Sequence, residues 1–521
     1  MGGVYEQHKV EPVAVRRLVR SWFKQVEMYS TPQTSVRFST YDLRGFWPKQ
    51  LPPLLLPVSA FLLLTAVLGP NLVQPVCAVI VLIIGSGILW RPMEPPILWF
   101  IFVFQWIEAS LHVFYLTLVE VPLGADYFES DPTYATWLAM LGLLCLAAGM
   151  RIAVGPARIA CALAVMGQIS QIPQLRLFKL YIVALLVATV VPLFADVVPG
   201  LRQPLLVANH LKWAAYVMFT IVTFVKPSAS RALWLLVFFL EFALGFGSYF
   251  SSFKFVFLYT FLGIMVSGYR LKAGQLAGVL ILVVSAVFLG AVWSEIKPDY
   301  RNYVNRGEKS QIVSVSYSDS VSKIYELVTQ MDGEDLKAGF DKMVNRISYI
   351  GFFGAATEFI PEYRPHAHGE ILLDALRRPF MPRLFFPDKE VIDESKLVRE
   401  YTGIWVSGME NGTQISLGFY GESYVDFGIY GVIFGLFGWG LFFGGIYRWL
   451  VFGWYSSGII GYGLASTVLI QAYGIGVSSA KLFGGIVTAL LVLYLFNRFV
   501  VPRYLGWLRS ATGSVEVGRL R

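Results

Sequence analysis

The sequence has little charge and very little cysteine. Only 15% of its 521 residues are Asp, Glu, Lys or Arg, whereas soluble domains typically carry about 25%. Its three cysteines (Cys77, Cys145 and Cys161) all lie in apolar stretches, so the chain offers neither a disulfide framework nor the paired spacing of a zinc ribbon. These shortages argue against a soluble enzyme of several domains. An aromatic content of 16% also excludes disordered, collagen-like and coiled-coil proteins.

Apolar residues make up 56% of the chain and gather into long runs. A helix needs about 20 mostly apolar residues to cross the hydrocarbon core of a bilayer. Twelve runs come near this length, so we expect an all-α, polytopic integral membrane protein with about 12 transmembrane helices. The expected spans are residues 51–68, 72–90, 97–119, 133–153, 180–198, 204–225, 232–248, 254–269, 273–293, 425–446, 457–474 and 481–498.

Lysine and arginine flank these spans instead of forming one patch, so the net charge of +8 indicates no nucleic-acid partner. Eight of them lie in residues 1–50, others recur in alternate loops, and the loop 120–132 is acidic. Because basic loops stay on the cytoplasmic side, both termini are expected there. Residues 15–26 form a basic amphipathic stretch, either a helix on an anionic leaflet or an ordinary packed helix. The first 50 residues contain no uninterrupted apolar core, so no signal peptide is expected.

One extramembrane segment is large, and the expected topology places it outside the cytoplasm. Apolar residues recur at helical spacing over 321–328 and 336–347, and a third short helix is expected over 370–378, before Pro379. A folded loop of this size usually carries function. The expected parts of the chain are the cytoplasmic segment 1–50, spans one to nine at 51–293, the periplasmic loop 294–424, spans ten to twelve at 425–498, and a basic cytoplasmic tail at 499–521.

This loop sets cations among aromatic residues and prolines. Guanidinium groups bind phosphate through a planar fork and keep their charge, so a cluster of them at a membrane face suits a lipid diphosphate head group. The alternative is an ordinary solvated loop surface. His366 and His368 have no cysteine or third histidine close in sequence, so no metal site is expected. The cations of this stretch are Arg364, Arg377, Arg378, Arg383 and Lys389.

Ionisable residues also occur within or beside the expected spans, where each needs a reason. His210 and Lys212 open the sixth span just after Arg202, either as interfacial anchors or as the lining of an anion site. Glu241 lies near the middle of the seventh span and is expected to hold a cation such as Lys254 or an arginine of the outer loop.

Three segments resemble the O-antigen polymerase (Wzy-type) family, whose members join lipid-linked oligosaccharide repeat units. RLFFPDK at 383–389 is followed by YGESYVDFGIYG at 420–431, which runs into a span after one long external loop. GSYFSSFK at 247–254 resembles that family's short outer turn ending in a basic residue. The resemblance covers about residues 230–445 and implies a GT-C-like glycosyltransferase of the bacterial inner membrane.

The substrate implied by the resemblance is a polyprenyl (undecaprenyl) diphosphate-linked oligosaccharide, with no metal and no other cofactor. The implied protein partners are a chain-length regulator and a flippase. Arg346, Arg364 and His366 are added to the expected site on their chemistry alone. The residues that the motifs place at the site are Lys254, Arg383, Lys389, Glu422 and Tyr424.

The expected chemistry needs a proton acceptor and a stabiliser of the leaving diphosphate. The cations are suited to the second task, and Glu422 or His366 to the first, since the acceptor hydroxyl must lose its proton. Glu422 has the better position, but it is equally expected to anchor the tenth span. Asp426 is expected to pair with a cation.

Three other functions compete with a polymerase. A glycan ligase would share the fold and the substrate but transfer finished polymer. A metal-dependent, protein-glycosylating transferase would want acidic residues in the first outer loop, which here is little more than Gly69, Pro70 and Asn71. A flippase predicts many intramembrane charges along a pathway and no large folded outer loop, so the sequence favours the enzyme.

Overall fold

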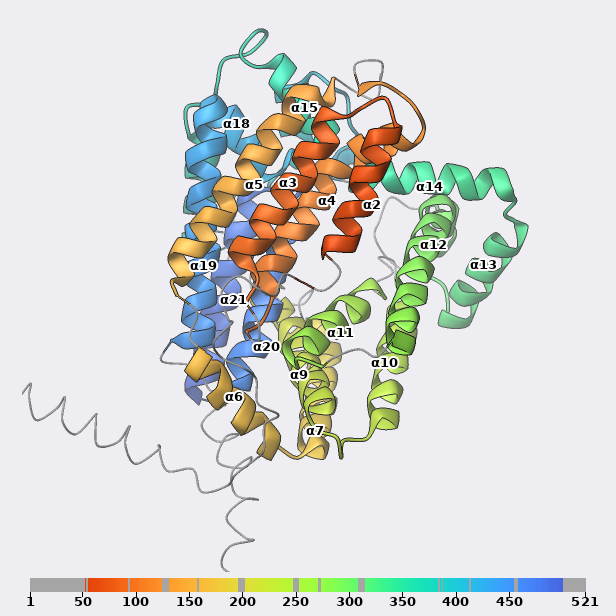
Figure 1. The fold of residues 1–521 in the computed structure, drawn as a ribbon, viewed down its shortest axis with the longest axis vertical. Helices are drawn as coiled ribbons and strands as arrows, with labels where there is room; N and C mark the ends of the chain where they lie inside the picture. Colours follow the sequence, from red (N-terminus) through yellow and green to blue (C-terminus); the bar gives the residue numbers. More distant parts are fainter. Residues whose placement is uncertain are drawn as a thin grey trace, which may run out of the picture. The chain divides into compact units, whose positions relative to one another are not determined.

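The computed structural model describes residues 52, 55–91, 94–123, 131–156, 159–194, 202–246, 253–269, 273–307, 314–382, 385–386, 388–411, 414–453 and 458–499. The amphipathic stretch 15–26 and the basic tail from residue 500 lie outside these ranges. In the part of the chain that the structure describes, all regular structure is helical (Figure 1). The expectation of an all-α chain is therefore confirmed for these residues.

The helices follow one another with short connections. Those before the loop region are α2 (Leu55–Leu68), α3 (Val73–Leu89), α4 (Ile97–Leu118), α5 (Pro132–Val154), α6 (Ile159–Gln171), α7 (Gln174–Val190), η3 (Val191–Phe194), α8 (Arg202–Leu206), α9 (Ala208–Val225), α10 (Arg231–Phe246), α11 (Lys254–Val266) and α12 (Ala273–Val304). Those that follow are α13 (Tyr317–Gln330), α14 (Gly333–Ile347), α15 (Ile350–Phe359), α16 (Glu370–Arg377), η5 (Arg378–Phe380), α17 (Glu394–Thr402), η6 (Met409–Asn411), α18 (Gly418–Tyr430), η7 (Gly431–Gly435), α19 (Leu436–Phe452), α20 (Ile459–Val468), η8 (Leu469–Ala472) and α21 (Ser479–Phe499).

Four stretches among the described residues are long and apolar enough to cross a membrane: α4, α5, Gln203–Val225 and Gly418–Phe452. Helices α6 and α7 include a pair bent by 93°, which adds a fifth if the pair is one broken span. Helices α2, α3 and α21 are among the apolar helices that are shorter than this. The chain therefore has several helices that could span a membrane, whereas a count of twelve spans stays a prediction.

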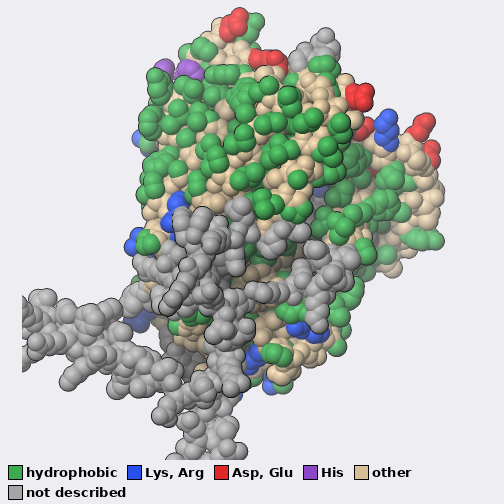
Figure 2. All heavy atoms as spheres, in the orientation of Figure 1, with side chains coloured by type: hydrophobic (Ala, Val, Ile, Leu, Met, Phe, Trp, Pro, Cys, Tyr) green, Lys and Arg blue, Asp and Glu red, His purple; other side chains and the backbone are tan. Residues whose placement is uncertain are grey.

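The surface of these helices is itself apolar. Phe61 of α2, Ile281 of α12 and Leu491 of α21 are each about 60% exposed or more (62%, 67% and 59%), and hydrophobic side chains cover much of the face shown in Figure 2. Soluble monomers rarely expose large continuous apolar patches. A lipid environment accounts for this surface, which supports a membrane protein.

Helices α5 and α19 approach each other closely because small residues line their contact. A Cβ atom on Gly149 would lie 2.3 Å from the carbonyl oxygen of Phe437. On the facing helix, a Cβ on Gly440 would lie 2.2 Å from the Leu146 oxygen, and one on Gly444 would lie 2.5 Å from the Met150 oxygen. Small residues four apart are the usual means of close helix packing in membranes.

Helices α7, α9 and α10 are joined by a buried carboxylate. Glu241 accepts hydrogen bonds from Tyr181 Oη at 2.6 Å and from Lys212 Nζ at 2.8 Å. The side chains of Lys212 and Glu241 are only 14% and 2% exposed. The expectation that Glu241 pairs with Lys254 or an outer-loop arginine is therefore wrong, because Lys212 of the neighbouring helix fills that role.

Helix α12 continues past residue 293 to Val304, so the expected start of the loop at 294 lies inside a helix. Helices α13 and α14 contain the stretches expected at 321–328 and 336–347. Tyr115 Oη of α4 donates to Asp341 at 2.7 Å, which ties α14 to the membrane helices. The small core between α12 and α13 consists of Val292, Ile296, Tyr300, Val304 and Ile324.

Candidate functional site

The motif YGESYVDFGIYG forms a helix that breaks in its middle. Within α18, Phe427 has φ −140° and Gly428 has φ +61° and ψ −143°, so neither residue is helical. Side chains other than hydrogen rarely tolerate the conformation of Gly428. The chain then makes the π-helical turn η7, where a Cβ on Gly431 would lie 1.7 Å from the Ser423 oxygen. The glycines of the motif therefore allow a bend that re-aims the residues between them.

Asp426, in the last regular turn before this break, caps helix α16. Its carboxylate accepts the backbone N–H groups of Gly369 at 3.1 Å, Ile371 at 3.2 Å and Leu372 at 2.9 Å. The first N–H groups of a helix have no partner within the helix, and an anion placed there is favoured by the helix dipole. Asp426 is 2% exposed. The expectation that it pairs with a cation is wrong, because a helix N-terminus takes that place.

His366 lies on the same part of α18. Its Nδ1 atom is 3.2 Å from the carbonyl oxygen of Val425, which also accepts the N–H of Ala367 at 2.9 Å. The imidazole packs edge-on against the Tyr424 ring, with centroids 5.8 Å apart, and a Cβ on Gly428 would lie 3.2 Å from its Nε2. We call Tyr424, Val425, Asp426 and Gly428 the α18 platform.

The contact with Val425 fixes the chemistry of this histidine. A carbonyl oxygen only accepts hydrogen bonds, so the Nδ1 atom must carry the proton that it donates. In the neutral ring the Nε2 atom then keeps its lone pair and is the proton acceptor. His366 is only partly buried. The α18 platform thus holds one half-buried histidine in the tautomer of a general base.

Glu422, one turn before Asp426 on α18, caps a second helix. Its carboxylate accepts the N–H of Ser479 at 2.7 Å, at the start of α21. It is 3% exposed. Glu422 therefore anchors α18 to α21, which is the structural alternative expected for it, and its other expected role, as a base, has a competitor in His366.

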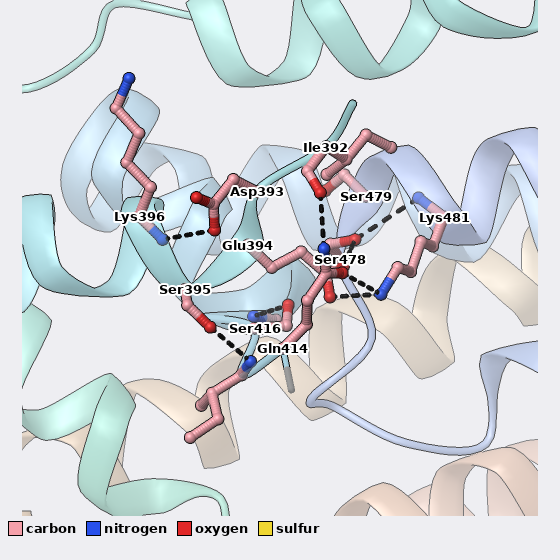
Figure 3. A network of polar contacts seen from close by, with 12 residues as sticks. Ile392, Asp393, Glu394, Ser395, Lys396, Gln414, Ser416, Ser478, Ser479 and Lys481 are labelled. Atoms are coloured by element: carbon pink, nitrogen blue, oxygen red, sulfur yellow. Dashed lines mark hydrogen bonds and ion pairs between the residues drawn. The ribbon is translucent and has the colours of Figure 1, made fainter. Parts of the chain in front are cut away.

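A network of polar contacts continues from this point (Figure 3). The buried Glu394 of α17 accepts hydrogen bonds from Ser478 Oγ and from Lys481 Nζ, and Lys481 also reaches Gln414 Oε1 at 3.1 Å. In the close-up these side chains point toward one another, whereas Lys396 points away. The network fastens the loop helix α17 to the first turn of α21.

Tyr349, which precedes α15, lies against the same region. A Cβ on Gly418 would lie 2.9 Å from its ring, and one on Gly476 would lie 2.7 Å from it. Burial, together with the nearby carboxylates of Glu422 and Glu394, raises the pKa of Tyr349 well above its usual value. The phenol therefore stays protonated beside these carboxylates.

Two of the expected phosphate ligands already have protein partners. Arg364 forms an ion pair with Glu400 and lies over the Tyr401 ring, 4.5 Å from its centroid. Lys389 Nζ donates to the carbonyl oxygens of Arg378 at 2.5 Å and Met381 at 3.1 Å, at the end of the helical stretch that begins with α16. Such groups bind a diphosphate only if they exchange these partners.

The remaining expected ligands are scattered or lie outside the described residues. Arg346 is exposed in the last turn of α14. Lys212 is held by Glu241, so it offers no free charge for an anion, and His210 of the same helix lies beside the Thr467 backbone. The side chains of Arg202 and Lys254, and the whole of Arg383, lie outside the described residues.

Of the expected site residues, the structure brings His366, Glu422 and Tyr424 together on or against α18. The sequence analysis missed the partners that hold them, above all Glu394, Ser478 and Lys481. One signal was present: two serines directly before an apolar run are typical of the start of a helix. The partner of such a start, however, is far away in sequence and leaves no local pattern.

Comparison with known families assigns the chain without naming an activity. A family model described as a domain of unknown function (DUF8712) matches residues 96–505, a range that contains helices α4 to α21 and the whole α18 platform. No curated protein and no solved structure matches the chain. Because the family model covers most of its length, the protein belongs to the DUF8712 family, whose function is unknown.

Proposed function

We propose that the protein is a membrane-embedded glycosyltransferase that polymerises oligosaccharide repeat units carried on a polyprenyl diphosphate. The observation that carries this proposal is His366, held on the α18 platform with its Nε2 atom as the proton acceptor. The motif that resembles O-antigen polymerases builds this platform, and the platform lies where loop helix α16 meets the membrane-type helix α18. We propose the outer face of a bacterial inner membrane as its location.

The proposed reaction has a simple balance of atoms. A hydroxyl oxygen of the acceptor unit attacks the anomeric carbon of the donor, and the bond from that carbon to the diphosphate oxygen breaks with its electron pair on the diphosphate. The hydroxyl proton passes to Nε2 of His366. The Arg383 and Lys254 positions of the motifs, with the exposed Arg377 of α16, are proposed to stabilise the charge on the leaving group.

Structural roles for the two buried carboxylates favour His366 as the base. Glu422 and Asp426 each accept backbone N–H groups at the start of a helix, so protonation or movement of either one would loosen a helix end. His366 has no such duty among the described contacts, because its Nδ1 atom alone makes the contact with Val425.

A flippase fits these contacts less well. A transport pathway needs ionisable groups that face a water-filled route, whereas Glu241 and Lys212 form a closed, buried pair with Tyr181. A glycan ligase remains the close alternative, since it would use the same donor and the same base.

The fate of repeat units in cells tests the proposal. The gene would be deleted and restored as wild type, His366→Asn or His368→Asn, and lipid-linked glycan would be sized on each side of the membrane. Polymerase activity predicts single repeat units outside in the deletion and the His366→Asn cells, and long chains in the other two. Single units trapped inside would favour a flippase, and long polymer left on its lipid carrier would favour a ligase.

A further inference from the structure

Three arginines gather at the far end of α5, away from the α18 platform. At the start of α5, the N–H of Asp131 donates to Glu358 of α15 at 2.8 Å, so this end lies beside the loop helices. The helix then runs for 23 residues, about 35 Å at 1.5 Å per residue, to Gly155. This distance matches a membrane thickness, so the two ends of α5 lie near opposite faces of the bilayer.

The arginines converge on the carbonyl groups that end this helix. Arg91 Nη2 and Arg151 Nη1 both donate to the Gly155 oxygen. Arg448 of α19 donates to the Ala153 oxygen at 3.4 Å. Cations are favoured at a helix C-terminus, but two guanidinium groups on one oxygen also repel each other.

One carboxylate is too little to balance this charge. Glu94 accepts from Arg91 Nη1 at 3.1 Å and from Tyr447 Oη at 3.4 Å. The four side chains together leave a formal charge of +2, since three are cations and one is an anion. Arg91 uses two of its N–H groups in these contacts, out of the five that a guanidinium group carries.

A small cavity opens among the same residues. It is lined by the guanidinium-bearing Arg91 and Arg151 and by apolar and aromatic side chains, and no carboxylate is among its described lining residues. Its volume of about 10 Å³ is that of one water-sized group. One oxygen of a tetrahedral anion fills such a space while the rest of the anion stays at the mouth, where Arg448 is exposed. The described lining residues are Leu89, Arg91, Pro95, Leu98, Trp99, Met150, Arg151, Val154 and Tyr447.

We propose that Arg91, Arg151 and Arg448 bind the phosphate of an anionic phospholipid head group at this face of the membrane. Planar guanidinium forks match phosphate oxygens, and basic pockets between membrane helices are typical sites for anionic lipids. A bound phosphate also offsets the repulsion between Arg91 and Arg151. The site is independent of the glycosyltransferase proposal, because it lies at the opposite end of α5.

Thermal unfolding of the purified full chain in neutral detergent tests the site. Short-chain phosphatidylglycerol is expected to raise the unfolding midpoint saturably, whereas phosphatidylcholine and inorganic phosphate at equal concentration are not. The Arg151→Gln/Arg448→Gln variant should need at least about tenfold more phosphatidylglycerol for the same rise, since it loses two charge-assisted contacts. Lys179→Gln, which removes an exposed cation of α7, should behave as the wild type.

Each other outcome decides against some part of the proposal. An equal rise with phosphatidylcholine, or with the double variant, overturns the site. An equal rise with inorganic phosphate assigns the arginines to a free anion and overturns the lipid. If the double variant does not fold, Arg448→Gln replaces it, because this side chain is exposed and contacts one carbonyl group only; an unchanged response of this variant also overturns the site.

Discussion

Replacement of Asp426 by asparagine tests the α18 platform most simply. The aspartate uses Oδ1 for Gly369 and Ile371 and Oδ2 for Leu372. Asparagine keeps one acceptor oxygen and presents an NH₂ group in place of the other, so one helix N–H faces a donor. Loss of a helix cap costs about 1 kcal/mol, and a lost hydrogen bond to a charged, buried acceptor costs about 1.5–3 kcal/mol. We expect α16 to be destabilised by about 2 kcal/mol.

Hydrogen exchange of the purified protein measures this change where it occurs. At 1.4 kcal/mol for each factor of ten, amides of α16 should lose about 30-fold of their protection. Asp374→Asn is the matched control on the same helix, because its carboxylate is 55% exposed and pairs at the surface with Arg378. A surface pair of this kind contributes about 0–1 kcal/mol. If Asp426→Asn changes exchange in α16 no more than Asp374→Asn does, the capping account is refuted.

Three further changes test other parts of the structure. Lys212→Met leaves Glu241 buried without its cation and should cost about 3–5 kcal/mol; the unfolding midpoint should recover in Lys212→Met/Glu241→Leu, and a double variant no better than the single one contradicts the pairing. Gly428→Ala forces an alanine into φ +61° and toward His366, so it should cost about 1–3 kcal/mol and lower polymer yield, whereas wild-type stability would show that the bend is not required. Glu422→Gln should lower the unfolding midpoint by about 1–2 kcal/mol in stability yet keep activity within tenfold; complete loss of activity in folded protein would make Glu422 the base.

Long apolar runs in the sequence predicted the positions of the membrane-type helices but not all of their ends. Helix α12 continues to Val304 because Ile296 and Tyr300, past the apolar run, still bury one face against α13. A search for uninterrupted apolar residues stops where only one face of a helix stays apolar. The helices α15 and α17 were missed because they are only 10 and 9 residues long.

The motif located the platform, but its contacts could not be read from it. Asp426 binds backbone N–H groups more than fifty residues earlier in the chain, and a backbone group has no residue type to recognise. The Lys212–Glu241 pair joins two helices across 29 residues, and several cations were equally good partners in the sequence. Residue types thus predicted which side chains matter, while the packing of α16, α18 and α21 decided what each one binds.

The most direct test of the central claim is polymerisation by the purified protein in liposomes supplied with a lipid-linked repeat unit. In His366→Asn the side-chain amide replaces the Nδ1 donor to Val425 and no atom replaces the Nε2 acceptor. The account predicts a ladder of lengthening chains for wild type and for His368→Asn, and a rate reduced by about 10²–10⁴ for His366→Asn. An undiminished ladder from His366→Asn would contradict the role of His366, and no ladder from folded wild-type protein would contradict the polymerase itself.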